Sequence, residues 1–149
     1  MVAGGAAAPV GFAPGEVIAV DSAPIIYYLQ DHPRHAPRFA PLFEAADAGA
    51  VEIVISAITV AEVLSGPMAQ GSELLVARYR EALASTPHWT VYPVDVDLAA
   101  DAARLRARYK LRLPDALQVA TALKARADRF VTHDRRLKRV KELTVVGIG

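Results

Sequence analysis

The sequence contains no cysteine. This absence excludes a disulfide-stabilised scaffold, a thiol nucleophile, a zinc site with cysteine ligands and an iron–sulfur cluster. Any metal chemistry must therefore use carboxylates, histidines or water as ligands. The sequence also lacks an uninterrupted stretch of about 18 apolar residues, so we expect no membrane span and a cytoplasmic protein.

The chain has little net charge, because 17 basic residues nearly balance 16 acidic residues. Bulk charge therefore does not indicate a nucleic-acid-binding protein, and any attraction to phosphate must be local. The chain has 149 residues, of which 53% are hydrophobic and 22% are charged. This length and composition are typical of one globular domain.

The first 15 residues differ from the rest of the chain, because they carry no charge and are rich in alanine, glycine and proline. They have neither the basic region nor the unbroken apolar core of a secretion signal. We interpret residues 1–15 as a flexible leader and residues 16–149 as a single domain.

Beyond the leader, short apolar runs alternate with amphipathic segments. Runs typical of buried strands lie at residues 17–20, 51–56, 89–94, 130–132 and 143–146. Helices are predicted at residues 25–30, 37–49, 57–64, 72–84, 97–109, 114–127 and 135–140. Ser22 is a candidate N-cap of the first helix, and Gly66-Pro67 is a candidate end of the third. The alternation predicts an α/β fold with a mostly parallel five-stranded sheet and helices on both faces.

Four acidic residues lie where such a fold places its functional sites. Asp21 follows the first predicted strand and Asp134 follows the fourth. Asp115 opens a helix, and Glu62 lies within the short helix after the second strand. The carboxyl ends of parallel strands meet at one edge of the sheet, so we expect these side chains to gather there.

A gathering of carboxylates needs a counter-charge. At about 5 Å separation and an effective dielectric constant near 20, each pair repels by about 3 kcal/mol. Either some of the acids are protonated or a hard cation lies between them. Mg²⁺ and Mn²⁺ prefer oxygen ligands, and either ion would supply the chemistry of phosphodiester hydrolysis.

Each acid also has a purely structural interpretation. Asp21, Asp115 and Asp134 lie at helix N-termini, where acids cap the helix or complement its dipole. Glu62 lies among apolar residues, so either a ligand or an arginine partner is expected. Asp95-Val96-Asp97 resembles the D-x-D sequence of phosphoaspartate hydrolases, but helix capping is favoured because a helical pattern follows at once.

Four segments together resemble the acidic motifs of PIN-domain ribonucleases, above all the toxins of VapBC-type toxin–antitoxin pairs. The segments are VIAVDSAPIIYYL, ISAITVAEVL, LRLPDALQVATAL and FVTHDRRL. The resemblance implies a three-layer α/β/α sandwich and a Mg²⁺- or Mn²⁺-dependent endoribonuclease that hydrolyses RNA phosphodiester bonds. It also implies that the metal ligands and catalytic residues are Asp21, Glu62, Asp115 and Asp134.

The resemblance extends to two hydroxyl residues and departs from the family at one position. Ser22 and Thr132 match hydroxyl positions that orient a carboxylate or a water, although both are also ordinary capping residues. The family usually has asparagine where this sequence has His133. His32 and His35 lie in a polar loop without metal-ligand spacing, and we expect them to be solvated.

Basic residues flank two of the acids and are candidates for RNA binding, which depends largely on phosphate contacts. These candidates are Lys110 and Arg112 before Asp115, and Arg135 and Arg136 after Asp134. An ordinary solvated helix face is the alternative interpretation. The resemblance further implies a homodimer and a small antitoxin that occludes the acidic pocket, with residues 63–79 as its docking region by analogy.

Two other functions are compatible with the same residues. One is a PIN-type RNA-processing nuclease that has no antitoxin. The other is a non-catalytic α/β module whose acids are helix caps and whose surface binds protein.

Overall fold

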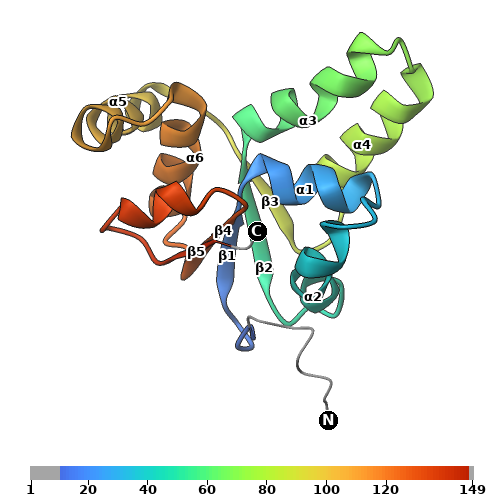
Figure 1. Ribbon diagram of the computed structural model, residues 1–149, viewed down its shortest axis with the longest axis horizontal. Helices are drawn as coiled ribbons and strands as arrows, with labels where there is room; N and C mark the ends of the chain where they lie inside the picture. Colours follow the sequence, from blue (N-terminus) through green and yellow to red (C-terminus); the bar gives the residue numbers. More distant parts are fainter. Residues whose placement is uncertain (1–10, 148–149) are drawn as a thin grey trace.

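A sheet of five parallel strands forms the centre of the computed structural model, which describes residues 11–147 (Figure 1). Its strands are β1 (Val17–Val20), β2 (Glu52–Ser56), β3 (Trp89–Tyr92), β4 (Arg129–Thr132) and β5 (Val145–Gly147). They lie in the order β3-β2-β1-β4-β5, and each neighbouring pair is parallel. The predicted parallel five-stranded sheet is therefore confirmed.

Helices cover both faces of the sheet. They are α1 (Ser22–Leu29), α2 (Ala36–Asp47), α3 (Ala57–Ala69), α4 (Glu73–Ser85), α5 (Val96–Tyr109), α6 (Leu113–Lys124) and the short 3-10 helix η2 (Arg135–Arg139). Over residues 11–147, none of the helices has both the length and the apolar character needed to cross a membrane.

Two apolar clusters, one on each face of the sheet, form the core. Side chains alternate along a strand, so Ile18 and Val20 of β1 belong to one cluster and Ala19 belongs to the other. The first cluster packs against α1, α2 and α4, and the second against α5 and α6. Figure 1 shows α5 and α6 on the opposite side of the sheet from α1 and α2. The predicted three-layer α/β/α sandwich is confirmed.

The direction in which strands are added to the sheet reverses at β1. The chain first builds β2 and β3 on one side of β1, then returns through α5 and α6 to place β4 and β5 on the other side. In sheets of this kind, ligands bind outside the carboxyl ends of the strands at the point of reversal. Here that point lies between β1 and β4, which are followed by Asp21 and Asp134.

Predicted boundaries of α1, α3 and α6 were wrong, and α6 ends at Lys124 rather than at residue 127. Helix α1 begins at Ser22, and its N-cap is Asp21 rather than Ser22, because the Asp21 carboxylate accepts the Ser22 N–H at 2.7 Å. Helix α3 does not end at Gly66-Pro67 but continues to Ala69. Helix α2 likewise continues through a proline, Pro41, so neither proline ends its helix in this fold.

The predicted leader divides into two parts. Residues 1–10 lie outside the described residues. Residues 11–15 contact the domain: the Gly15 N–H donates to the Ala50 carbonyl at 2.7 Å, and Phe12 packs against the core. The Arg129 guanidinium lies 4.8 Å from the centre of the Phe12 ring. This end of the leader is therefore held on the domain surface.

Candidate active site

The four predicted acids line one cleft at the carboxyl ends of the strands, and its volume is about 510 Å³. The residues that line it are Asp21, Ser22, Ala23, Ile26, Glu62, Ser65, Arg112, Asp115, Gln118, His133 and Asp134. They come from the β1–α1 junction, α3, α6 and the segments that precede α6 and follow β4. The fold therefore brings together the acids that the sequence singled out.

Asp21 lies deep in the cleft, with 8% of its surface exposed. Its carboxylate accepts hydrogen bonds from neutral groups, namely the Thr132 hydroxyl at 2.6 Å and the Ser22 N–H at 2.7 Å. Burial raises the pKa of the Asp21 carboxyl above its ordinary value, and the charges of Asp115 and Glu62 add to the rise. The two hydrogen bonds oppose the rise without cancelling it.

Thr132 connects Asp21 to Asp134. Val20 pairs with Val131 in the β1–β4 ladder, so the next residues, Asp21 and Thr132, lie side by side. The fully buried Thr132 hydroxyl donates to Asp21 and accepts the N–H of Asp134 at 2.9 Å. One hydroxyl thus positions the residues that follow both central strands.

A second hydrogen-bonded group holds Glu62. The Ser22 hydroxyl donates to Oε1 of Glu62 at 2.5 Å, and the Gln118 amide donates to the same oxygen at 2.9 Å. The Gln118 amide also donates to the Ser22 oxygen at 2.9 Å. Glu62 is therefore hydrogen-bonded to a hydroxyl and an amide, and not to the arginine that was one of its two expected partners.

Sequence reasoning missed Gln118. It lies one helical turn after Asp115 on α6, where its polar side chain is 4% exposed among apolar neighbours. A lone amide on the same helical face as a predicted ligand was the signal that could have found it. Its Oε1 atom is buried and has no hydrogen-bond partner within residues 11–147.

The other two acids are paired with arginines. Arg112 donates through Nε to Oδ2 of Asp115 at 3.1 Å. Arg136 donates through Nη2 and Nε to the two carboxylate oxygens of Asp134, at 2.8 and 3.0 Å. The hydrogen bond from Arg136 is the main reason that the pKa of the Asp134 carboxyl lies below its ordinary value.

Three of the acids that follow strands also cap helices, as the structural interpretation expected. Asp21 caps α1, Asp134 caps η2 by accepting the Arg136 N–H, and Asp95 caps α5 by accepting the Leu98 N–H at 2.9 Å. Only Asp21 and Asp134 among these three line the cleft. Capping and a place in the cleft are therefore compatible for these two acids, whereas Asp95 is accounted for by its cap.

His133, which lines the cleft, packs against two other rings. Its ring lies 5.4 Å from that of Tyr27 and 4.9 Å from that of His35, measured between ring centres. The rings of His32 and His35 stack at 4.8 Å, so the expectation that these histidines are simply solvated was wrong. Burial, followed by the nearby His32 and His133, lowers the pKa of His35.

The donor atoms of the cleft suit a hard divalent cation, because its four acids offer only carboxylate oxygens. The side chains are not gathered around a common point, since no three His, Asp or Glu residues within residues 11–147 are placed to hold a metal ion. Their carboxylates are engaged by hydroxyl, amide and guanidinium donors. Cation binding therefore requires at least the arginines to move.

The predicted RNA-binding residues lie beside the acids. Lys110, Arg112 and Arg136 line a small hollow of about 90 Å³ that adjoins the cleft. Arg135, the fourth, packs instead against the end of β5, where a Cβ added to Gly147 would lie 2.8 Å from its Cγ. Positive charge is thus concentrated on one side of the acids.

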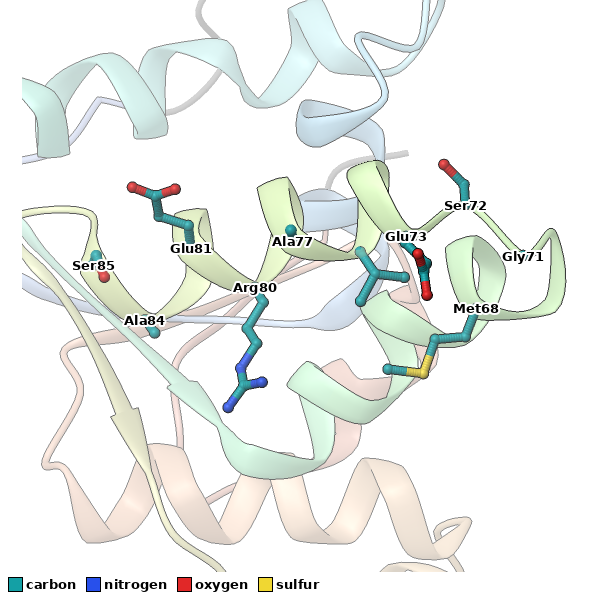
Figure 2. Close-up of a pocket in the computed structure, with 10 residues that line it drawn as sticks. Met68, Gly71, Ser72, Glu73, Ala77, Arg80, Glu81, Ala84 and Ser85 are labelled. Carbon is teal, nitrogen blue, oxygen red and sulfur yellow. The ribbon is translucent and has the colours of Figure 1, made fainter.

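An apolar groove lies between α3 and α4, away from the cleft, with a volume of about 870 Å³ (Figure 2). Residues at the end of α3 and along α4 line it, including Met68, Val76, Ala77 and Ala84. Met68, at the end of α3, is 59% exposed. In Figure 2, Arg80 and Glu81 point to opposite sides of α4.

A family model described as PIN domain matches residues 18–143. No curated protein matches this sequence significantly. The structure of VapBC2 from Rickettsia felis, bound to a DNA fragment from their promoter, is similar with a TM-score of 0.70 and 17% identity. The match covers 89% of this chain and 99% of that chain.

Two further structures are similar. A toxin–antitoxin complex from Klebsiella pneumoniae has a TM-score of 0.65 at 25% identity, over 87% of this chain and 95% of that chain. VapC20 from Mycobacterium tuberculosis, described as a toxin that cleaves the sarcin–ricin loop, has a TM-score of 0.62 at 15% identity. That match covers 76% of this chain and 86% of that chain.

Proposed function

This chain belongs to the PIN domain family, and we propose that it is a Mg²⁺- or Mn²⁺-dependent endoribonuclease that acts in the cytoplasm as the toxin of a toxin–antitoxin pair. The observation that carries the proposal is the single cleft lined by all four acids of the family motifs. The similar structures support the toxin assignment, since VapBC2 and the Klebsiella complex are toxin–antitoxin proteins.

The residues that would hold the cation are Asp21, Glu62, Asp115 and Asp134. A bound Mg²⁺ or Mn²⁺ lowers the pKa of a coordinated water and balances charge on phosphate oxygens. The other residues of the cleft orient the acids. Thr132 donates a hydrogen bond to Asp21, and Ser22 and Gln118 both donate to one oxygen of Glu62. The carboxylates of Asp21 and Glu62 are therefore positioned before any ligand binds.

A positive charge close to the buried Asp21 carboxylate would be favourable. Its raised pKa shows that neutral donors do not compensate its charge fully. A divalent cation would do so, and it would have to displace a proton where the carboxyl is protonated. RNA is the substrate class that the family motifs favour, and the cations beside the acids fit its phosphates.

Cleavage of RNA by the purified protein tests the proposal. We expect cleavage that requires Mn²⁺ or Mg²⁺, stops on chelation and falls at least about 100-fold in Asp21→Asn and Asp115→Asn. The matched control is Asp101→Asn, because Asp101 is an exposed α5 carboxylate that also pairs with an arginine, Arg104, at 2.9 Å. Equal cleavage by the wild type, Asp21→Asn and Asp115→Asn would refute the assignment.

The partner assignment rests on the apolar groove between α3 and α4. We propose that a helix of the antitoxin docks there, because the groove is open, largely apolar and overlaps the region predicted at residues 63–79. Met68→Glu should then weaken co-purification with the protein encoded beside this one. Val96→Glu is the control, since Val96 is an exposed apolar residue on α5. Unchanged co-purification of the Met68 variant would contradict this docking site.

Self-association is a separate prediction of the family resemblance. Light scattering of the purified chain measures it, and a mass of one chain, 15.9 kDa, at micromolar concentration would contradict the predicted homodimer.

A further inference from the structure

The acidic cleft and the small basic hollow share a wall. Arg112, Asp115 and Asp134 line both, and Arg136, Lys110 and Arg139 line the hollow. Asp115 and Asp134 therefore lie next to four basic side chains, those of Lys110, Arg112, Arg136 and Arg139. Arg139 is fixed there, because it donates through Nη2 to the Tyr109 carbonyl at 3.0 Å.

Within each of the two ion pairs on this wall, the carboxylate and the guanidinium differ in exposure. The carboxylates are mostly enclosed, with Asp115 11% and Asp134 26% exposed at the side chain. Their partners Arg112 and Arg136 are 74% and 75% exposed. The carboxylates are thus held by the fold, whereas the guanidinium groups can swing out into solvent. Each arginine supplies the positive charge beside a carboxylate that a divalent cation would otherwise supply.

We propose that Arg112 and Arg136 are exchangeable counter-ions of the cleft. Without a divalent cation they neutralise Asp115 and Asp134; once a cation takes those carboxylates, they bind a phosphate group of the nucleic-acid strand in the adjoining hollow, together with Lys110 and Arg139. This inference rests on the proposed metal-dependent function. It makes the binding of cation and of phosphate cooperative, because each ligand releases the partner that the other requires.

The chemistry of the arginines suits this exchange. A guanidinium presents two parallel N–H donors that fit a carboxylate and a phosphate equally well. Arg136 already uses this fork on Asp134, through Nη2 and Nε. Ion pairs with an exposed partner contribute at most about fivefold to an equilibrium constant, so the exchange costs little.

The pair of Arg104 and Asp101 on α5 is a natural control. It has the same i,i+3 spacing as Arg112 and Asp115, a similar N–O distance of 2.9 Å and the same 74% exposure of the arginine. It does not line the acidic cleft. Removing Arg104 thus changes the net charge as removing Arg112 does, without freeing a carboxylate of the cleft.

The first experiment titrates Mn²⁺ into the protein by calorimetry, without nucleic acid. Arg112→Gln and Arg136→Gln should each bind Mn²⁺ about three- to fivefold more tightly than the wild type, and the double variant at least about tenfold more tightly. Arg104→Gln should stay within about twofold. Unchanged or weaker binding in the double variant overturns the exchange. A wild type that binds no Mn²⁺ overturns the proposed function instead.

The second experiment measures binding of a single-stranded 2′-O-methyl RNA by fluorescence anisotropy, with its integrity checked on a gel. The wild type should bind this strand at least about tenfold more tightly with Mn²⁺ than with chelator, and the double variant should lose most of that gain. Arg104→Gln should keep the gain. If the double variant gains as much from Mn²⁺ as the wild type does, the arginines do not bind the phosphate.

Discussion

Asp21 and Asp134 follow neighbouring strands and line the same cleft, but the fold compensates their charges in opposite ways. Asp21 is buried, accepts hydrogen bonds from a hydroxyl and a backbone N–H, and has a raised pKa. Asp134 is more exposed, pairs with Arg136 and has a lowered pKa. The same difference divides the other two acids, since Glu62 is held by neutral groups and Asp115 by Arg112.

The difference separates an inner from an outer half of the cleft. The inner half, Asp21 and Glu62, is held rigidly and lacks a positive partner. In the outer half, Asp115 and Asp134 each form an ion pair with an arginine, Arg112 and Arg136 respectively. Asp21 and Glu62 should therefore contribute most to the affinity for a cation. At Asp115 and Asp134, a cation must first displace Arg112 and Arg136. The two halves should therefore respond differently to a cation, to substitution and to pH.

Adding the cation should stabilise the protein through the inner half. At a free Mn²⁺ concentration of about 100 times Kd, linkage predicts about 2.7 kcal/mol of stabilisation. That corresponds to an increase in Tm of roughly 5–10 °C, measured by thermal denaturation. Asp21→Asn should lose most of this increase, and Asp134→Asn should keep more of it. An equal increase in the Tm of the wild type and of Asp21→Asn would contradict binding of the cation at the inner half of the cleft.

Removing the hydroxyl that joins the two halves should destabilise the protein. Thr132→Val deprives the buried Asp21 carboxylate of a donor and the partly buried Asp134 N–H of its acceptor. Leaving such groups unpaired costs about 1–3 kcal/mol, measured by urea denaturation. Thr132→Ser keeps the hydroxyl and loses only a methyl group, so its loss should be smaller. Equal losses in the two variants would show that packing alone matters at this position.

Neutralising one acid of each half should have opposite effects on the metal-free protein. In chelator at pH 7, Asp21→Asn should raise the free energy of unfolding, because it removes a charge from a buried group near other acids. Asp134→Asn should give no such gain, because it breaks an ion pair. Urea denaturation of both variants and the wild type from pH 4 to pH 8 measures the difference.

The pH dependence should also differ in sign. The folded-state pKa of Asp21 is raised, so its contribution to stability is complete below the ordinary aspartate pKa and is lost as pH rises through the folded-state value. The advantage of Asp21→Asn should therefore vanish towards pH 4. The folded-state pKa of Asp134 is lowered, so its contribution is present above the ordinary pKa and is lost as pH falls. A pH-independent advantage of Asp21→Asn would contradict the raised pKa.

The sheet and the four acids could be predicted from the sequence because both depend on local patterns. A buried parallel strand is a short apolar run, and the residue after it lies at one edge of the sheet wherever the strand is placed. The path of α3 through Gly66-Pro67 and the place of Gln118 could not be predicted as readily. A proline normally ends or kinks a helix, and α3 departs from that local rule. The place of Gln118 depends on a contact between residues 56 positions apart.

Amino-acid composition alone limits the chemistry available to this protein. Without cysteine, a metal site must use carboxylate, histidine or water ligands, and four acids lie after strands or early in helices. How each carboxylate is compensated depends instead on the folded arrangement of the chain. Burial and the distance to a donor set the pKa of an acid, and both depend on which segments pack together. Asp21 and Asp134 have similar local contexts after a strand, and their opposite pKa shifts come from the burial of Asp21 and from the hydrogen bond that Arg136 donates to Asp134 in the folded cleft.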